Sequence, residues 1–341
     1  MVPISTSKSS SPTVGSKSPK PGQVITARHI KGEKGGGGLD HGQFLFCSKP
    51  SRQNFRFNVS ANISPTKSFR YNNLLSCGQE LEGIETKIEL AICLFTGVDE
   101  IMHLPEFIVY HNLMGVDKFY VYFNAKDEEI EETWHYLKPF VESGLIELIP
   151  FYFKTRSYID GIQVVAYNDC LYKHKDYVKW LGILDTDEFF MLAPTSPFKL
   201  LTDYLKSLEN YSQIAFPTAF FVYQNGNVSF YMEKCKFPSF INDWLLMADE
   251  RENRPPKSIY RAGNITYADV HGARGFDGSI RWLPMEDALL GHYRYPYLPF
   301  TIEGIKNGTY TKNDYYKTVF GAKIIEKLHE IGFDKYKVNC V

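Results

Sequence analysis

The chain has 341 residues, of which 44% are hydrophobic and 15% aromatic, and its formal net charge at pH 7 is −1. This length and apolar share are enough for one large domain or two modest domains with a buried core. The near-neutral charge argues against nucleic acid as the main partner. The six cysteines include no CxxC pair and no Cys/His cluster, which argues against a structural zinc site.

The first 86 residues show little regular patterning. Residues 1–40 are rich in Ser, Pro and Lys and contain a glycine run, so they are expected to be disordered. Residues 41–86 carry scattered aromatic residues and are expected to form an extended arm or short strands. No stretch of the sequence has the length and apolarity of a transmembrane helix, and the N-terminus lacks the apolar segment of a signal peptide.

From residue 87 onward, strand and helix patterns alternate. Apolar, β-branched runs predict strands over 88–95, 118–123, 145–151 and 178–184, and helical spacing predicts helices over 101–114, 128–143 and 163–173. Gly115 and Gly144 follow the first two helices, in positions typical of helix ends. This order predicts a parallel sheet with covering helices. It makes residues 87–190 the first half of a domain that continues to about residue 320.

The pattern loosens after residue 190. A helix is expected over 198–208 and strands over 214–222, 258–265 and 267–271. A polar and aromatic turn is expected over 291–297 and a terminal helix over 315–331. Residues 321–341 are taken as the C-terminal helix and tail that follow the domain. Residues 223–256 show little periodicity, and long irregular segments in compact domains are usually functional or flexible.

The apolar run 178–184 ends in Asp185, Asp187 and Glu188. Open α/β sheets bind ligands beyond the carboxyl ends of their strands. Buried carboxylates without partners are costly, and a divalent ion carrying a diphosphate would account for them. The plainer alternative is an aspartate that caps the next turn. Glu188 is expected to point away from its neighbour and to bond to backbone or to an arginine.

Several blocks of the sequence resemble glycosyltransferase family 92 and the related family-2-like group. The blocks are Glu106–Tyr122, Gln163 with Ala166–Leu171, Trp180–Phe189, Asp269–His271 and His292–Arg294. The resemblance implies a GT-A-like (Rossmann-like) α/β fold with a mixed, mostly parallel sheet and helices on both faces. It also implies an inverting transfer of a sugar, often galactose, from a UDP-sugar with Mn²⁺ or Mg²⁺.

The resemblance implies the site residues as well. Asp185 and Asp187 would hold the metal, with one of them free to reach the ribose instead, and the third ligand would be His292 or, as second choice, His271. The donor would be contacted by Thr96, Glu100, Asn124, Gln163 and Arg294. Gln163 and Asp169 lie on different faces of one helix, so at most one of them is expected to touch the donor, while the other fastens the helix to a loop.

The chain departs from the family pattern near the expected nucleotide. In the loop after the first strand, only Glu100 clearly matches the family pattern. At the end of the second strand, only Asn124 matches it, and Phe107 stands where the family usually has a tryptophan. These changes leave the identity of the donor open.

The general base should be a carboxylate on the acceptor side of the metal. The candidates are Asp243, Asp249, Glu250 and Glu233, each of which has an ordinary solvated charge as its alternative. Asp243 is preferred because Trp244 beside it suits stacking on a sugar face.

Other residues have more ordinary expected roles. Cys93 and Cys170 lie in apolar patterns and are expected to be buried thiols, and His111 is expected in the core. Asn-x-Ser/Thr sequons occur at Asn58, Asn62, Asn210, Asn227, Asn264 and Asn307, which hints at a secretory lineage. The compartment stays open: cytoplasmic if the chain is complete, and the Golgi or secretory lumen if it belongs to a longer anchored protein.

Two other functions compete with a glycosyltransferase that moves a sugar from a nucleotide-sugar to a glycan or small-molecule acceptor and releases the nucleotide. A nucleotidyltransferase acting on sugar phosphates also uses carboxylates at strand ends, but it needs a Gly-rich phosphate loop after the first strand, and Thr96-Gly97-Val98 is a poor version of one. A degenerate transferase that serves as a binding module would explain the altered donor loop.

Overall fold

A computed structural model describes residues 55–64, 67–76, 88–152, 161–222, 239–243, 246–248, 256–274, 278–293 and 310–333. The chain divides into two units, residues 1–82 and 83–341. In the first unit, β1 (Phe55–Ser64) and β2 (Lys67–Ser76) pair as an antiparallel hairpin. Residues 1–40, which are expected to be disordered, lie outside the described part.

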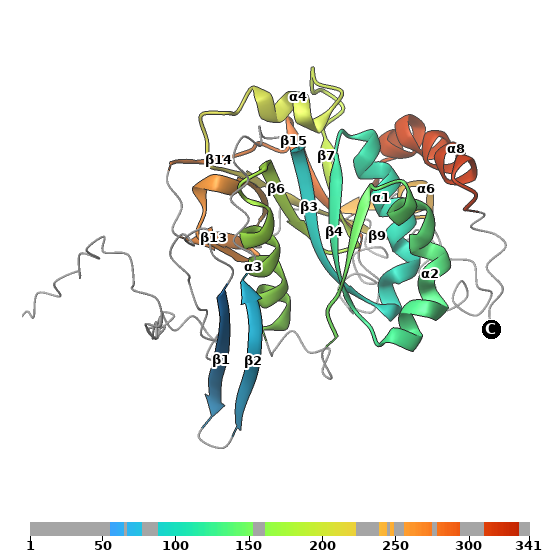
Figure 1. Ribbon diagram of the computed structural model, residues 1–341. Coiled ribbons are helices and arrows are strands. Elements are labelled where there is room, and N and C mark those ends of the chain that lie inside the picture. Colours follow the sequence, from blue (N-terminus) through green and yellow to red (C-terminus); the bar gives the residue numbers. More distant parts are fainter. Residues whose placement is uncertain are drawn as a thin grey trace, which may run out of the picture. The chain divides into compact units, whose positions relative to one another are not determined.

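The second unit is built on a seven-stranded sheet (Figure 1). Its parallel part consists of β3 (Ile88–Gly97), β4 (Lys118–Asn124), β5 (Ile146–Pro150) and β6 (Val178–Leu184), in the order β5-β4-β3-β6. All three of these pairings are parallel, which confirms the predicted alternation of strands and helices. The strands β3, β4 and β6 are nearly continuous apolar runs because both faces of the sheet are covered there, whereas the edge strand β5 is partly exposed.

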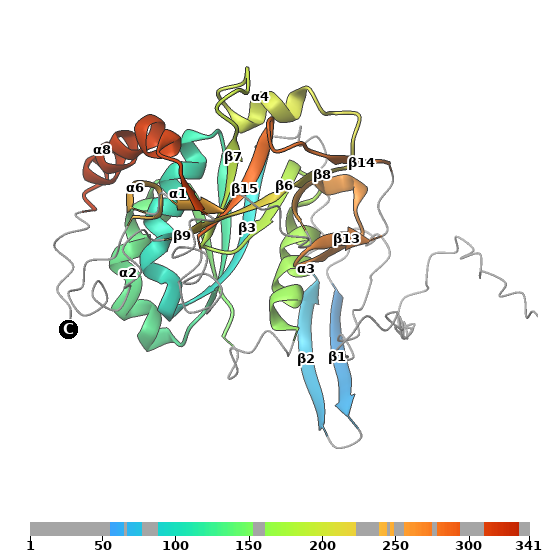
Figure 2. The same cartoon turned by 180° about the vertical axis from the view of Figure 1, so that it is seen from behind.

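Helices cover the two faces of this sheet. Their bounds are η1 (Val98–His103), α1 (Leu104–Leu113), α2 (Asp127–Glu142) and α3 (Ile162–His174). Leu90, Ile92 and Leu94 of β3 pack in the core with α1 and α2, whereas Ala91 and Cys93 point to the opposite face, under α3. The alternation follows from the two-residue period of a strand. Figures 1 and 2 show α3 on one side of the sheet and α1 and α2 on the other.

Two glycines end the helices that precede β4 and β5, as predicted. Gly115 and Gly144 have φ values of +97° and +77°, a region that favours glycine. A Cβ at Gly115 would also lie 2.6 Å from the Thr202 hydroxyl oxygen. The helix expected over 101–114 is split into the 3₁₀ turn η1 and α1, and Pro105 sits in the first turn of α1, where its missing N–H costs nothing.

Three further strands extend the sheet beyond β6. They are β11 (Lys257–Arg261), β8 (Gln213–Phe216) and β14 (Ile280–Trp282). β11 runs antiparallel to both β6 and β8, and β14 runs parallel to β8. The sheet is therefore mixed and mostly parallel, with helices on both faces, as the expected fold class requires.

A second sheet has the order β16-β10-β9-β15-β7. Its strands are β16 (Tyr310–Lys312), β10 (Leu246–Ala248), β9 (Thr218–Val222), β15 (Ala288–Tyr293) and β7 (Glu188–Leu192). The single strand predicted over 214–222 is wrong, because Pro217 separates β8 from β9 and the two strands join different sheets.

The turn predicted over 291–297 is also wrong for residues 291–293, which belong to β15. β15 pairs with β7 on one side and β9 on the other, and the Tyr293 ring stacks on Phe221 at 4.9 Å. Aromatic residues favour such positions in strands, so the aromatic character of this stretch was a strand signal. Residues 294–297 lie outside the described part.

The remaining elements are short, apart from the last helix. They are α4 (Leu201–Lys206), α6 (Phe240–Asp243), η3 (Ala262–Asn264), the pair β12 (Tyr267–Asp269) and β13 (Gly272–Arg274), the π-helical turn η4 (Lys317–Gly321) and α8 (Ala322–Glu330). η4 and α8 together form the expected terminal helix. Within the described ranges, no helix is long and apolar enough to cross a membrane.

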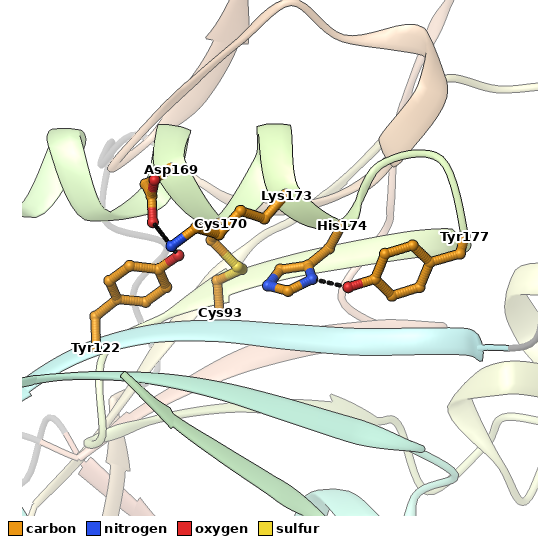
Figure 3. The surroundings of a disulfide bond; sticks show 7 residues. All are labelled: Cys93, Tyr122, Asp169, Cys170, Lys173, His174 and Tyr177. Atoms are coloured by element: carbon orange, nitrogen blue, oxygen red, sulfur yellow. Dashed lines mark hydrogen bonds and ion pairs between the residues drawn. A yellow bond between two sulfur atoms is a disulfide. The ribbon is translucent and has the colours of Figure 1, made fainter. Parts of the chain in front are cut away.

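Cys93 on β3 and Cys170 on α3 form a buried disulfide (Figure 3). Their Cα atoms lie 6.5 Å apart, within the range of protein disulfides. The expectation of two free thiols is therefore wrong. The apolar patterns correctly indicated that both residues are buried, but they carried no information that two positions 77 residues apart face each other.

Asp169 gives α3 a second attachment to the sheet. Its carboxylate accepts a hydrogen bond of 2.7 Å from the Tyr122 hydroxyl on β4 and pairs with Lys173 at 2.6 Å (Figure 3). Asp169 thus fastens the helix, as expected of one of the two residues Gln163 and Asp169, but to a strand and not to a loop.

The disulfide predicts a stability difference. Replacement of both residues in Cys93→Ala/Cys170→Ala should lower the free energy of unfolding by about 2–4 kcal/mol, because the cross-link restricts the unfolded chain. Urea titrations with and without reductant measure this loss. Reductant should lower the stability of the parent and leave the double variant unchanged; a parent that is insensitive to reductant contradicts the cross-link.

Candidate active site

The three carboxylates at the end of β6 lie in a tight turn between the two sheets. The Glu188 backbone N–H donates to the Asp185 carbonyl at 3.1 Å, which closes the turn and starts β7. The Asp185 N–H in turn donates to the Glu188 carboxylate at 3.0 Å. Glu188 therefore folds back on the turn and bonds to backbone, as expected, while its charged partner is a lysine and not an arginine.

That lysine is Lys257, the first residue of β11. Its Nζ lies 3.0 Å from Asp185 Oδ2 and 3.0 Å from Glu188 Oε2, and its side chain is only 2% exposed. Burial would lower the pKa of Lys257, but the two carboxylates outweigh burial and raise the pKa above its ordinary value. Lys257 is therefore a permanent positive charge inside the site.

The two carboxylates respond differently to this lysine. Burial would raise the pKa of Asp185, but the Lys257 charge and its hydrogen bond outweigh burial and hold the pKa below its usual value. For Glu188, burial prevails over the attraction of Lys257, and with the negative charge of Asp185 it raises the pKa to about 7. Of the two carboxylates, Asp185 is therefore the one that stays ionised at neutral pH.

The other oxygen of Asp185 is held by α3. Gln163 Nε2 donates to Asp185 Oδ1 at 2.6 Å, and the Tyr167 hydroxyl lies 3.3 Å from the same oxygen. Gln163 was predicted to contact the donor; in the structure it is buried and supports Asp185. Both oxygens of Asp185 therefore have partners within the protein.

Asp187 and His292 form a second, more accessible pair. His292 Nε2 lies 3.3 Å from Asp187 Oδ2, and the side chains are 15% and 32% exposed respectively. The pairing of β15 with β7 sets this contact, because His292 stands opposite Glu188 in the register and the Tyr293 N–H donates to the Asp187 carbonyl at 2.8 Å. The structure thus brings together Asp187 and the preferred histidine.

His271, the second-choice ligand, lies in the turn between β12 and β13. The surrounding protein lowers its pKa by desolvation, and the Lys257 charge lowers it further, while Asp185 raises it. His271 is therefore within electrostatic range of Lys257, Asp185 and His292. His111 is in the core, as predicted, where its Nδ1 lies 2.9 Å from the Phe107 carbonyl oxygen.

Thr96 and Asn124 lie at the carboxyl ends of the neighbouring strands β3 and β4, and Glu100 lies in η1, directly after β3. Gly97 stands opposite Asn124 in the register of β3 and β4, and Leu94 stands opposite Leu184 in that of β3 and β6. The Thr96 hydroxyl lies 3.4 Å from the Glu100 carboxylate. These side chains therefore share the carboxyl edge of the sheet with Asp185, as the strand order predicted.

The negative charges of Asp185 and Asp187 affect the pKa of Glu100. Desolvation by the surrounding protein, and then the charges of Asp187 and Asp185, raise the pKa of Glu100 to about 7, although the residue keeps an exposed surface. A cation placed beside Asp187 would remove this repulsion and lower the Glu100 pKa.

Of the candidate bases, only Asp243 lies in the described part of the chain. It ends α6, and its Oδ2 accepts a hydrogen bond of 2.7 Å from the Ser239 N–H. The buried Glu106 of α1 holds the same turn by accepting from the Phe240 and Ile241 N–H groups at 2.9 and 3.0 Å. Asp249, Glu250 and Glu233 lie outside the described residues, as does the donor candidate Arg294.

The sequence analysis missed Lys257 and Tyr167. Lys257 stands two residues before the buried Ile259 on β11, so strand alternation places it on the same inward face. That spacing was a usable signal, although lysines in such segments are usually solvated. Tyr167 was visible as the residue one helical turn after Gln163 on the same face of α3.

Comparison with known proteins places the chain in a family. The model of glycosyltransferase family 92 matches residues 88–331, which contain every element from β3 to α8. The chain belongs to glycosyltransferase family 92. The match covers the Asp187–His292 pair and the Lys257 group.

Relatives of this family 92 chain include plant enzymes. Galactan beta-1,4-galactosyltransferase GALS3 of Arabidopsis thaliana is 33% identical over 162 residues, which is 46% of this chain and 27% of the relative. A glycosyltransferase family 92 protein of Ricinus communis is 31% identical over 108 residues, 31% of this chain and 17% of the relative. The aligned segments thus span about a quarter or less of these relatives.

Solved structures give weaker similarities to the family 92 chain. The galactosyltransferase LgtC aligns with a TM-score of 0.33 and 10% identity over 68% of this chain and 95% of its own. The glucosyl-3-phosphoglycerate synthase of Mycobacterium tuberculosis, solved with Mn²⁺ and UDP, aligns with a TM-score of 0.31 and 12% identity. The alignment covers 75% of this chain and 84% of the synthase. At these values the similarities support no conclusion about this chain.

The Glu100 pKa predicts a pH-dependent stability. Between the ordinary pKa of a glutamate, 4.5, and about 7, the folded chain holds a proton that the unfolded chain has lost. This contribution lowers the free energy of unfolding as the pH rises through that window. Glu100→Gln removes the contribution, so the stability of the variant relative to the parent should increase from pH 5 to 7 and then level off.

Urea titrations at pH 5, 6, 7 and 8 measure this difference. Glu128→Gln, which neutralises an exposed carboxylate on α2, is the matched control and should show a flat difference. A flat difference for Glu100→Gln as well would contradict the raised pKa.

Proposed function

We propose that this chain is a metal-dependent glycosyltransferase that moves a sugar, with galactose as the first candidate, from a UDP-sugar to a hydroxyl group of a glycan or other acceptor, with inversion. The observation that carries the proposal is the Asp187–His292 pair at the carboxyl edge of the sheet, beside a carboxylate group already neutralised by Lys257. Membership of family 92 and the names of the plant relatives support it.

The donor atoms of the pair fit Mn²⁺ or Mg²⁺. Among the described residues, no three His, Cys, Asp or Glu side chains are grouped to hold a metal ion. Ions of this type commonly bind through one or two protein side chains and complete their coordination with phosphate oxygens and water. Asp187 and His292 supply one carboxylate oxygen and one imidazole nitrogen 3.3 Å apart, so a diphosphate would complete the site. The ion, once bound, would neutralise the charge of the departing diphosphate.

Residues on the neighbouring strands would hold the rest of the donor. Thr96 and Asn124 lie at the ends of β3 and β4 and Glu100 directly after β3, at the edge of the sheet where nucleotides bind in folds of this class. Arg294 follows His292 and Tyr293 in the chain, and we assign it to a diphosphate oxygen, since a guanidinium forms paired bonds with phosphate. We no longer assign Gln163 to the donor, because its side-chain amide is hydrogen-bonded to Asp185.

An inverting transfer requires a carboxylate that removes the proton of the acceptor hydroxyl. Asp243 is the weaker candidate, because one of its oxygens already closes the α6 turn. We therefore favour Asp249 and Glu250, which follow β10 directly in the sequence.

The competing reading as a nucleotidyltransferase receives no support from the site. β3 runs through Gly97 straight into the 3₁₀ turn η1, which carries Asp99 and Glu100 and ends at His103. A Gly-rich loop followed by a basic residue, which that class needs for its triphosphate substrate, does not fit this connection.

The buried disulfide favours one of the two compartments left open by the sequence. Disulfides form and persist in oxidising compartments and are rare in the cytosol. We infer that the chain folds in the secretory lumen, in agreement with its sequons, and that cytosolic expression would yield reduced Cys93 and Cys170.

A screen of nucleotide-sugars tests the proposal. UDP-galactose should be turned over with Mn²⁺, and chelation of the metal should abolish turnover. Asp187→Asn and His292→Ala should each reduce kcat/KM by about 100-fold or more, since both remove a group that acts on the developing diphosphate charge. Asp203→Asn, an exposed carboxylate on α4, is the matched control and should keep full activity.

Other outcomes of the screen separate the alternatives. Turnover of a different nucleotide-sugar would replace galactose as the substrate. Release of diphosphate from a nucleoside triphosphate and a sugar phosphate would indicate a nucleotidyltransferase. Binding of UDP without turnover of any donor would indicate a binding module.

A further inference from the structure

Lys257 occupies the place of a bound cation between Asp185 and Glu188. Its ammonium nitrogen lies 3.0 Å from one oxygen of each carboxylate, and all three side chains belong to different parts of the site: the turn, β7 and β11. The lysine and Glu188 side chains are 2% and 3% exposed and Asp185 is 24% exposed, so water reaches this group only at Asp185. A divalent ion here would have to displace a buried lysine.

The other oxygen of Asp185, Oδ1, also has hydrogen-bond partners within the protein. A carboxylate can only accept hydrogen bonds, so the Gln163 amide must present its NH₂ group to Asp185 Oδ1, at 2.6 Å. The Tyr167 hydroxyl approaches the same oxygen. An ion bound through Asp185 Oδ1 would compete with Gln163 and Tyr167, and an ion bound through Oδ2 would place a second cation beside the Lys257 ammonium.

Asp187 is in the opposite situation. Its side chain is the more exposed of the two, at 32% against 24% for Asp185, and it approaches His292 and not a permanent cation. Its backbone is fixed by the hydrogen bond from the Tyr293 N–H. Asp187 can therefore take up an ion without losing a buried ion pair.

We propose that the two aspartates of the turn have separate tasks. Asp185 is a positioning residue that Lys257 locks in place as a built-in cation, and Asp187, with His292, is the aspartate that ligates the mobile divalent ion. The proposal rests on the metal dependence proposed above and goes beyond it by naming Lys257 and by removing Asp185 from the metal ligands.

Titration of the full chain with Mn²⁺, followed by the electron paramagnetic resonance signal of free Mn²⁺, tests the separation. Asp187→Asn should weaken Mn²⁺ binding by about 30-fold or more, as expected when one of two protein ligands is lost. Asp185→Asn keeps the shape of the side chain and, because Asp185 does not ligate the ion in this proposal, should leave the affinity close to that of the parent. Equal losses in the two variants would overturn the proposal.

A second experiment tests the built-in cation. Lys257→Ala leaves Asp185 and Glu188 facing an empty cation position, so Mn²⁺ should now bind there as well and raise the Tm of this variant far more than that of the parent. In Lys257→Ala/Asp185→Asn the additional gain should disappear. Equal Mn²⁺-induced gains in the parent and both variants would contradict the role of Lys257.

The two experiments also separate this inference from the proposed function. A parent chain that binds no Mn²⁺, both without UDP and in its presence, would refute metal dependence, yet the Tm comparison of the two Lys257 variants would still report on the cation position. If Lys257→Ala does not fold, the comparison of Asp185→Asn with Asp187→Asn decides the matter alone, because both variants keep Lys257.

Discussion

The buried ion group of Lys257, Asp185 and Glu188 is the interaction on which the site depends. It joins β11 of the first sheet to β7 of the second through the turn that connects β6 and β7. Removal of Lys257 would leave Asp185 and Glu188 facing each other without a cation, and breaking a buried ion pair in this way typically costs about 3–5 kcal/mol. The group therefore fixes the turn, and the turn directs Asp187 toward His292.

The α3 helix holds this group through hydrogen bonds to Asp185. Gln163, Tyr167, Cys170 and His174 follow one another at helical spacing, so they share the face that packs on the sheet. The first two hold Asp185, and Cys170 is cross-linked to β3, the strand that leads to Thr96 and Glu100. The helix thus has a covalent attachment close to the residues that carry the charge of the site. Such rigid support is what a site needs when it must hold charged groups at fixed distances.

The sequence predicted the parallel half of the fold well, because its strands are continuous apolar runs and its helices end at glycine. It also located the carboxylates and the strand edge where they meet Thr96, Glu100 and Asn124. It failed where one position depends on a distant one. The Cys93–Cys170 bond joins residues whose local patterns indicate only burial, and the division of residues 213–222 between two sheets depends on the partners of β8 and β9.

Lys257 illustrates the same limit most clearly. A lysine at the start of a strand is usually exposed, and only the pairing of β11 with β6 brings it to the end of the carboxylate-bearing strand. Its presence changes the interpretation of the Asp-x-Asp turn, in which the two aspartates looked equivalent in the sequence. In the structure Asp185 is paired with the buried Lys257, whereas Asp187 is paired with His292 and is 32% exposed.

Anomalous scattering from crystals grown with Mn²⁺ and UDP is the most direct test of this account. We expect one ion within about 2.5 Å of both Asp187 Oδ2 and His292 Nε2, with a diphosphate oxygen on it and Lys257 still between Asp185 and Glu188. An ion bound between Asp185 and Glu188, with Lys257 displaced, would contradict it.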